Sequence, residues 1–357
     1  MERIEKLKSI MATLTENDPE FVVNENALEE SVAKQEENQA GLAVKVLTIF
    51  GGFLATNSFI AFCIAAGLYD SAGGLLVFGI VFIVISILLD RFYDRLIIDT
   101  FSVTMFASGL ALAGWGTGAL DSDLNLIPLS YIGVGIIIVF VARSFILTFL
   151  SILLINGSII TLMLMNSYYD LVHLYNTICT LLVTYLFLNE AKAISMNNRF
   201  TELYGPFRIG LVFSLLFGLI VLGKKGFIPV SENLVWLSSI VMFAAVLYMV
   251  TKILNIMSVM AVRMKLLVLI ASGLILLSTV FSPAIAGAIL ILLLSFKVNY
   301  RTGMAIGVIA LVYFISQYYY DLNFSLLTKS IMLMSSGSLF LLLYFFTSKK
   351  IDSNEEL

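Results

Sequence analysis

Residues 73–89 read GGLLVFGIVFIVISILL, and residues 90–95 read DRFYDR. The first stretch carries no charge, and as a helix it would be about 25 Å long at about 1.5 Å per residue. The hydrocarbon core of a bilayer is about 30 Å thick. Two arginines follow directly, as is typical of a loop on the cytoplasmic side of a membrane. These residues therefore predict a membrane-spanning helix with a basic cytoplasmic end.

Similar apolar stretches recur along the chain. We expect transmembrane helices at residues 46–66, 73–89, 96–119, 126–142, 144–165, 172–188, 207–223, 234–251, 266–282, 284–296, 302–320 and 330–347. The predicted fold is an all-α integral membrane protein with about 12 transmembrane helices. Its first partner is the lipid bilayer.

Composition supports the membrane class and excludes others. Hydrophobic residues make up 60% of the chain and charged residues 13%, far from the averages of soluble domains. A net charge of -3 and the lack of a basic stripe argue against nucleic acid as a partner. Cys63 and Cys179 lie inside apolar stretches, where a thiol behaves as a small hydrophobic group. We expect no cofactor.

Basic residues fall almost entirely into every second gap between the apolar stretches. Only Lys224, Lys225 and Lys329 lie on the opposite side. The thirteen on the predicted cytoplasmic side are Arg91, Arg95, Arg143, Lys192, Arg199, Arg208, Lys252, Arg263, Lys265, Lys297, Arg301, Lys349 and Lys350. This bias predicts that both termini are cytoplasmic.

The chain divides into three predicted parts. Residues 1–41 hold ten acidic residues and a helical apolar rhythm, so we expect a cytoplasmic helical cap. Residues 42–190 and 191–357 would each form a six-helix half. The sequence NSYYDL at 166–171 recurs as QYYYDL at 317–322, which fits two parallel repeats. The alternative is that Tyr simply recurs at the membrane interface.

One stretch leaves the number of crossings open. Residues 266–296 carry no charge and would be about 46 Å long as one helix. Ser282 and Pro283 favour a tight turn and two short crossings. A re-entrant segment could use the same residues.

Few polar residues lie within the predicted helices, and these are the first candidates for a binding or coupling site. Asp99 lies one turn into a predicted helix, four residues after Arg95, and could pair with it or act as a proton or cation site. Asn57 and Asn156 are explained by hydrogen bonds between helices, or they could line a transport path.

Two polar and aromatic patches are predicted on the outer side. Tyr169, Asp170 and His173 form the first. His173 is the only histidine, and no nearby residues complete a metal site. The second patch consists of Tyr318, Tyr319, Tyr320, Asp321, Lys329 and Ser330. Lys329 could pair with Asp321 or extend its amine to the headgroups.

Gly114, Gly116 and Gly118 flank Trp115 without a preceding strand or a following Lys. A phosphate-binding loop needs both features. We expect these glycines to allow helices to approach closely.

Short motifs resemble two known families. DRF at residues 90–92, YYDL at 319–322 and LLTKS at 326–330 are similar to an uncharacterised bacterial membrane family, domain of unknown function 4401. This resemblance implies a bacterial inner-membrane protein with a possible companion, a small membrane protein of the GDYxxLxY type. DRFYDR at 90–95 also resembles the cytoplasmic loop signature of major facilitator transporters. However, Ser86 and Tyr93 stand where that signature has glycine.

Three functional hypotheses follow. The first is a transporter-like or lipid-handling protein with a site between its halves. The second is an accessory or scaffold subunit of a membrane or envelope complex without catalytic activity. The third is an enzyme acting on lipid-linked sugars, which the short outer loops disfavour, so we expect no enzyme activity.

Overall fold

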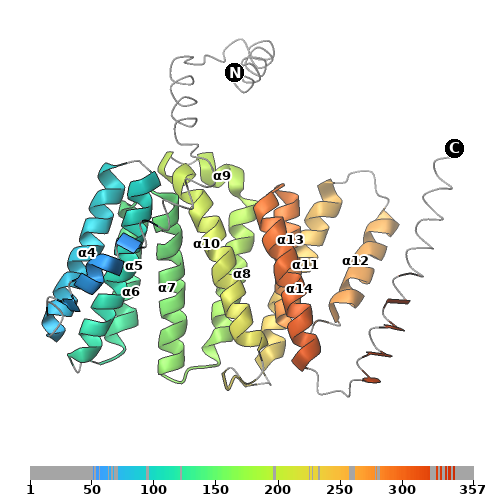
Figure 1. Ribbon diagram of the computed structural model, residues 1–357. Coiled ribbons are helices and arrows are strands. Elements are labelled where there is room, and N and C mark those ends of the chain that lie inside the picture. Colours follow the sequence, from blue (N-terminus) through green and yellow to red (C-terminus); the bar gives the residue numbers. More distant parts are fainter. Residues whose placement is uncertain are drawn as a thin grey trace, which may run out of the picture. The chain divides into compact units, whose positions relative to one another are not determined.

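In the computed structural model, the described residues form helices joined by turns, and no strands (Figure 1). It describes residues 51–341 apart from 52–53, 56, 63, 66, 68–70, 94–95, 121–122, 196–197, 225, 227, 232–233, 257–261, 278, 280–281, 322–326, 329, 332–333, 336 and 339–340. The helices are α4 (Ala72–Phe92), α5 (Leu96–Ala119), α6 (Leu126–Val141), α7 (Phe145–Met165), α8 (Leu171–Leu188), α9 (Glu190–Ser195), α10 (Asn198–Gly223), α11 (Val235–Ile256), α12 (Val262–Leu277), α13 (Pro283–Lys297) and α14 (Arg301–Asp321).

Several helices meet the requirements for crossing a membrane. Within the described residues, six are long and apolar enough: Ala72–Phe92, Phe145–Met165, Leu171–Leu188, Thr201–Gly223, Val235–Ile256 and Arg301–Asp321. The chain is therefore a multi-pass α-helical membrane protein. The total of about 12 crossings and the six-helix halves at 42–190 and 191–357 stay predictions.

Most helix boundaries agree with the predicted apolar stretches, but α10 begins at Asn198, nine residues before the predicted start at 207. Helix α5 covers Leu96–Ala119, as predicted. The uncharged stretch 266–296 is divided between α12 and α13, and Pro283 is the first residue of α13, so the predicted break is confirmed. The acidic cap at 1–41 lies outside the described residues.

Two compact units make up the fold, and their boundary falls between Ser158 and Ile159, inside α7. In the first unit, α4 and α5 pack along a seam of small residues. A Cβ on Gly79 would lie 2.5 Å from the backbone nitrogen of Ala113, and one on Gly116 would lie 2.6 Å from that of Leu76. The prediction that Gly116 allows close helix approach is thus confirmed.

Hydrogen bonds join α4 and α5 at the other end of this seam. The Ser86 hydroxyl donates to the Ser102 carbonyl at 2.8 Å, and the Ser102 hydroxyl donates to the Ser86 carbonyl at 2.8 Å. The small residues Ala72, Gly79 and Ser86 are spaced by seven, as are Ser102, Gly109 and Gly116. Two antiparallel helices can therefore contact each other backbone to backbone along their whole length.

A buried carboxylate joins the ends of α4 and α7 in this unit. Asp90 is 4% exposed, and its Oδ2 accepts the Arg143 N–H at 2.7 Å while its Oδ1 accepts the Ser144 N–H at 3.2 Å. These N–H groups precede the first turn of α7, which also has a partial positive charge. The DRF motif thus supplies a helix cap.

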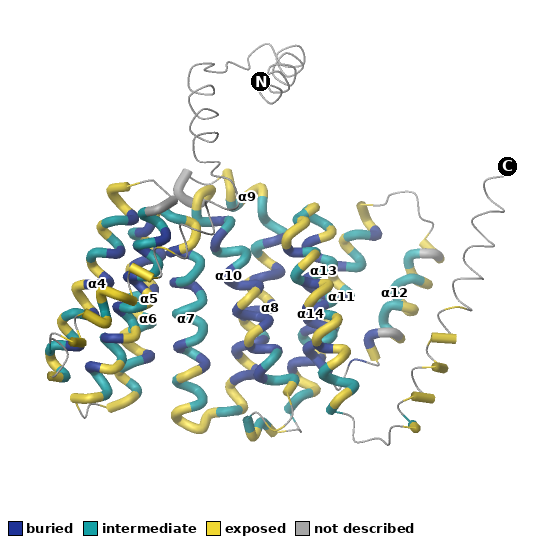
Figure 2. Tube along the Cα trace, in the orientation of Figure 1, coloured by how far each residue is buried: buried dark blue, intermediate teal, exposed yellow. Residues whose placement is uncertain are grey.

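In the second unit, α8, α10, α11 and α13 enclose the largest apolar core. Val183, Leu215, Met242 and Leu290 are at most 1% exposed. Buried segments concentrate along α8, α10 and α13 (dark blue in Figure 2). Polar side chains on α8 are enclosed in the same core.

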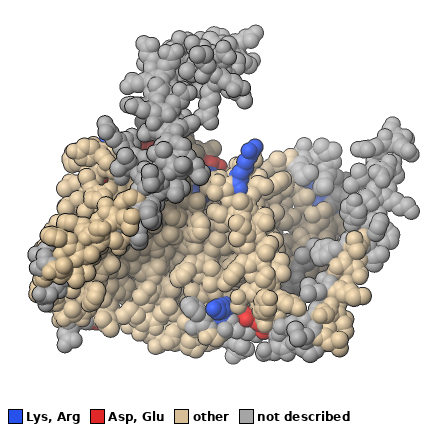
Figure 3. All heavy atoms as spheres, in the orientation of Figure 1, with Lys and Arg blue, Asp and Glu red and all other residues tan. Residues whose placement is uncertain are grey.

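The surface between the helix ends is apolar. Large side chains such as Phe140, Leu181 and Ile309 are more than half exposed. On the face shown in Figure 3, coloured charged atoms lie near the helix ends, and tan atoms cover the band between them. Lipid is the solvent that such a band requires.

Candidate functional site

One face of α8 carries a line of polar side chains through the core of the second unit. His173, Asn176, Thr180 and Thr184 are spaced by three, four and four residues, which places them on one helix face. All four are buried, at 2%, 0%, 0% and 9% exposed. We call these four residues the polar face of α8.

At the first turn of α8, this face contacts α11. His173 Nδ1 lies 2.7 Å from Ser238 Oγ, and His173 Nε2 is buried without a hydrogen-bond partner. A neutral imidazole has one donor and one acceptor nitrogen. The Ser238 hydroxyl can either donate to Nδ1 or accept from it, so both neutral tautomers of His173 fit this contact. In each tautomer, Nε2 still needs a hydrogen-bond partner.

Asp170, the residue just before α8, connects this end of the helix to Ser231. Its Oδ1 accepts the Ser231 N–H at 2.9 Å, and its Oδ2 accepts the Ser231 hydroxyl at 2.9 Å. The backbone bond, and then the hydroxyl bond, lower the pKa of Asp170 below its ordinary value. Asp170 therefore fastens the start of α8 to the segment before α11 as a carboxylate.

In the middle of α8, Asn176 bridges to α10. Its Nδ2 donates to the carbonyls of Val172 and Gly218, both at 3.1 Å, whereas its Oδ1 is buried without a partner. A Cβ on residue 218 would lie 2.5 Å from that oxygen, so glycine makes room for the amide. Thr180 donates to the Asn176 carbonyl at 2.7 Å.

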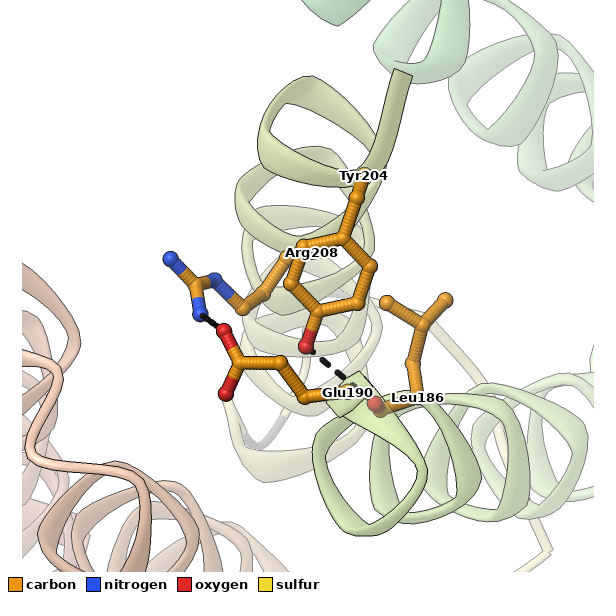
Figure 4. Close-up of polar contacts among 4 residues, drawn as sticks. All are labelled: Leu186, Glu190, Tyr204 and Arg208. Carbon is orange, nitrogen blue, oxygen red and sulfur yellow. Dashed lines mark hydrogen bonds and ion pairs between the residues drawn. The ribbon is translucent and has the colours of Figure 1, made fainter. Parts of the chain in front are cut away.

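The guanidinium of Arg208 lies near the last turn of α8, over the Phe187 ring. Thr184 Oγ1 is buried without a partner. Beyond it, Arg208 Nη1 of α10 donates to Glu190 Oε1 of α9 at 2.8 Å, and the two side chains point toward each other in Figure 4. Near them, the Tyr204 hydroxyl donates to the Leu186 carbonyl at 3.2 Å.

Aromatic rings surround the Arg208 guanidinium. Its Cζ lies 3.7 Å from the centroid of Tyr300, 5.1 Å from that of Tyr204 and 5.8 Å from that of Phe187. A cation over aromatic faces is attracted by their π electrons. Arg208 is 14% exposed, so stacking and one ion pair hold a largely buried charge.

The unpartnered polar atoms gather in the second unit. Among the described side chains, the buried nitrogen and oxygen atoms without a hydrogen bond are His173 Nε2, Asn176 Oδ1, Thr184 Oγ1, Arg208 Nε and Ser295 Oγ. Three of the five belong to the polar face of α8. Buried polar atoms are normally paired, and hydrocarbon offers no substitute for water.

The predicted outer patch around α8 is partly brought together. Asp170 and His173 both lie at the start of α8, one bonded to Ser231 and the other to Ser238. The Tyr169 hydroxyl instead donates to the Ser167 hydroxyl at 3.4 Å. The sequence did not indicate the serines, which lie more than 60 residues away along the chain.

The other predicted candidates are scattered. Asn156 donates to the Ile152 carbonyl of its own helix at 2.8 Å, and Asn57 is exposed. Asp99 is half-buried on α5, and its predicted partner Arg95 lies outside the described residues.

The second predicted patch lies around the end of α14. Gln317 Nε2 donates to Asp321 Oδ2 at 2.9 Å, Tyr320 is 76% exposed, and Ser330 is exposed. Lys329 lies outside the described residues, so its pairing with Asp321 stays a prediction. No group of three or more His, Cys, Asp or Glu side chains suited to a metal is present in the described part.

Sequence reasoning missed the polar face of α8 as a unit. Of its four members, only His173 was predicted as a candidate for a site. The three-four-four spacing was the available signal. The Arg208–Glu190 pair gave no signal, because its members belong to different helices.

A model of one protein family covers most of the chain. The domain of unknown function DUF4401 matches residues 41–350. The chain belongs to this family. The predicted resemblance to DUF4401 is thereby confirmed. No curated protein and no solved structure gives a significant match. The function of this DUF4401 protein is therefore inferred from the geometry of the chain itself.

Proposed function

We propose that the protein is transporter-like and that a small polar solute or a proton passes along the polar face of α8. The supporting observation is the set of unpartnered atoms on His173, Asn176 and Thr184. Polar groups inside a membrane are costly and usually serve a solute path, a proton relay or bound water. Their alignment on one face favours a path over isolated defects.

Polar contacts that involve charged side chains close the polar face of α8 at both ends. The Asp170 carboxylate and Ser231 lie at one end, and the Arg208–Glu190 pair lies at the other. Between them, the four side chains of the polar face are buried by α10 and α11. This arrangement corresponds to an occluded state, in which transport requires movement of α8 against its neighbours.

Water access to the polar face tests the proposal. In a background with Cys63 and Cys179 replaced by Ala, single cysteines are placed at Asn176, Thr180 and Thr184 and exposed to a small cationic methanethiosulfonate in membrane vesicles. Only a thiolate reacts, and it forms in water rather than in lipid. We expect labelling at least about tenfold faster than at lipid-facing positions of the same helix.

Matched controls are available on the lipid-exposed face of α8. Leu174, Leu181 and Tyr185 are 55%, 59% and 62% exposed and lie at similar depths. Cysteines there should label slowly. If the polar-face cysteines label equally slowly in variants that elute as folded protein, α8 is dry and the transport proposal is wrong.

A dry α8 would favour the alternative, an accessory subunit of a membrane complex. In that role, the polar face would fix helix register through specific hydrogen bonds. Stable co-purification with a small companion membrane protein would support this alternative. Neither role includes a catalytic step.

A further inference from the structure

An apolar groove of about 410 Å³ runs between α10 and α14 in the second unit. Its floor consists of Leu216, Ala310 and Phe314, which are at most 9% exposed. Its rim includes Phe217 and Ile309, which are 47% and 69% exposed. The groove thus opens to the surroundings of the protein, which are lipid.

The walls suit a hydrocarbon chain better than another helix. Close packing of membrane helices requires small residues at the contact, whereas this rim carries Phe, Ile and Tyr side chains. Gly307 of α14 faces α13 rather than the groove, since a Cβ at this position would lie 2.8 Å from Leu292. A thin, flexible chain can fill the groove and supply the dispersion contacts that an empty groove lacks.

The length of the groove fits one leaflet. Its lining on α14 extends from Ile306 to Phe314, which is about 12 Å at about 1.5 Å per residue. One leaflet contributes about half of a hydrocarbon core of about 30 Å. A single acyl chain can therefore occupy the groove from one side of the membrane.

Charged residues lie beyond the same end of both groove walls. Helices α10 and α14 run in the same direction: Arg208 in the middle of α10 stacks on Tyr300 just before α14, and the groove is lined by later residues of both helices. Lys224 follows Ile220 by one turn, and Asp321 follows Tyr313 by about two turns, so both continue the groove side. Gln317 orients the Asp321 carboxylate with a hydrogen bond of 2.9 Å.

We propose that this groove binds one zwitterionic aminophospholipid, with an acyl chain between α10 and α14, the phosphate at Lys224 and the ammonium at Asp321. A purely anionic headgroup carries no cation of its own that could pair with the Asp321 carboxylate. A choline headgroup has no N–H to donate to that carboxylate. The inference is independent of the proposed path along α8.

Lipid binding by the purified full chain tests the inference. Native mass spectrometry is performed in detergent with added phosphatidylethanolamine, phosphatidylglycerol or phosphatidylcholine of identical acyl chains. We expect one saturable phosphatidylethanolamine adduct. Ala310→Phe fills the floor of the groove and should weaken this binding by about tenfold or more.

The matched control is Val312→Phe, because Val312 is 61% exposed and does not line the groove. It should bind lipid as the unmodified protein does. If Ala310→Phe fails to fold, Ile309→Trp covers the groove from its exposed rim. Equal binding by a folded groove variant and the control overturns the inference.

The headgroup assignment has its own readout. Asp321→Asn should remove the preference for phosphatidylethanolamine over phosphatidylcholine, and Lys224→Gln should weaken binding of all three phospholipids. Equal affinity of the unmodified protein for phosphatidylethanolamine and phosphatidylcholine would contradict the assignment. Dry labelling of α8 would leave this result unchanged, so the two proposals fail separately.

Discussion

At the residue scale, the polar groups of α8 differ in how they are satisfied. Thr180 bonds the backbone of its own helix and contacts Met242 Sδ at 3.3 Å. His173 and Asn176 instead reach neighbouring helices and each keep one atom without a partner. The first kind of residue is compatible with simple packing, whereas the second calls for a further partner.

Asp170 gives a residue-scale prediction for pH. Since the Ser231 N–H and hydroxyl lower its pKa, the carboxylate stabilises the fold above the pKa of Asp in the unfolded chain. This contribution is lost as pH falls through the lower folded pKa. We expect Asp170→Asn to lower the melting temperature of the purified protein at neutral pH, and the difference should vanish in strong acid.

Ser231→Ala provides the control for this prediction. It removes the hydroxyl donor but keeps the backbone N–H, so its effect should be smaller than that of Asp170→Asn. The double variant should melt close to Asp170→Asn, because both changes act on one interaction. A difference between Asp170→Asn and the unmodified protein that persists unchanged in strong acid would contradict the assignment.

The sequence predicted individual polar residues better than it predicted their partners. Asp170 and His173 were expected together because they are three residues apart. Ser231 and Ser238 come from another part of the chain, and nothing in their spacing refers to α8. Likewise, Glu190 and Arg208 had ordinary positions near predicted helix ends, and only folding places them 2.8 Å apart.

At the element scale, hydropathy was a reliable guide because lipid demands long apolar helices. It predicted the bounds of α5, whereas the turn residues Ser282 and Pro283 predicted the break before α13. It could not predict which helices pair, since lipid-facing and helix-facing residues are both apolar. The pairing of α4 with α5 is instead encoded by small residues spaced by seven.

The seam between α4 and α5 gives an element-scale prediction. In Gly79→Ala, the added methyl group would lie 2.5 Å from a backbone atom of Ala113, so the helices must separate. We expect a loss of about 1–3 kcal/mol in the free energy of unfolding, measured by thermal or denaturant unfolding in detergent.

Gly133→Ala is the matched control on α6. Nothing lies within 4 Å of a Cβ at that position, and alanine favours helix over glycine by about 1 kcal/mol. This variant should be as stable as the unmodified protein or more so. The seam would lose its assigned role if Gly79→Ala matched Gly133→Ala.

At the scale of the whole molecule, the charge pattern predicts how the chain is oriented in the membrane. Lys297 and Arg301 flank the turn between α13 and α14, and the segment between α8 and α10 contains Lys192. Lys224 directly follows α10. We expect the first two connections and both termini to be cytoplasmic.

Reporter fusions check this topology. A fluorescent protein should mature when fused after Lys192 or Asn299, and alkaline phosphatase should be active when fused after Gly226. The fusion at the C-terminus should behave like the one after Asn299. Termini on opposite sides would reject the predicted orientation and an even number of crossings.

The backbone contact between α4 and α5 has a consequence for biogenesis. The two helices are adjacent in the chain, and Gly79, Gly109 and Gly116 let their backbones meet directly. Contacts between such near neighbours form rapidly. We therefore expect this hairpin to assemble during membrane insertion, before the ribosome has synthesised α8, and to serve as a template for later segments.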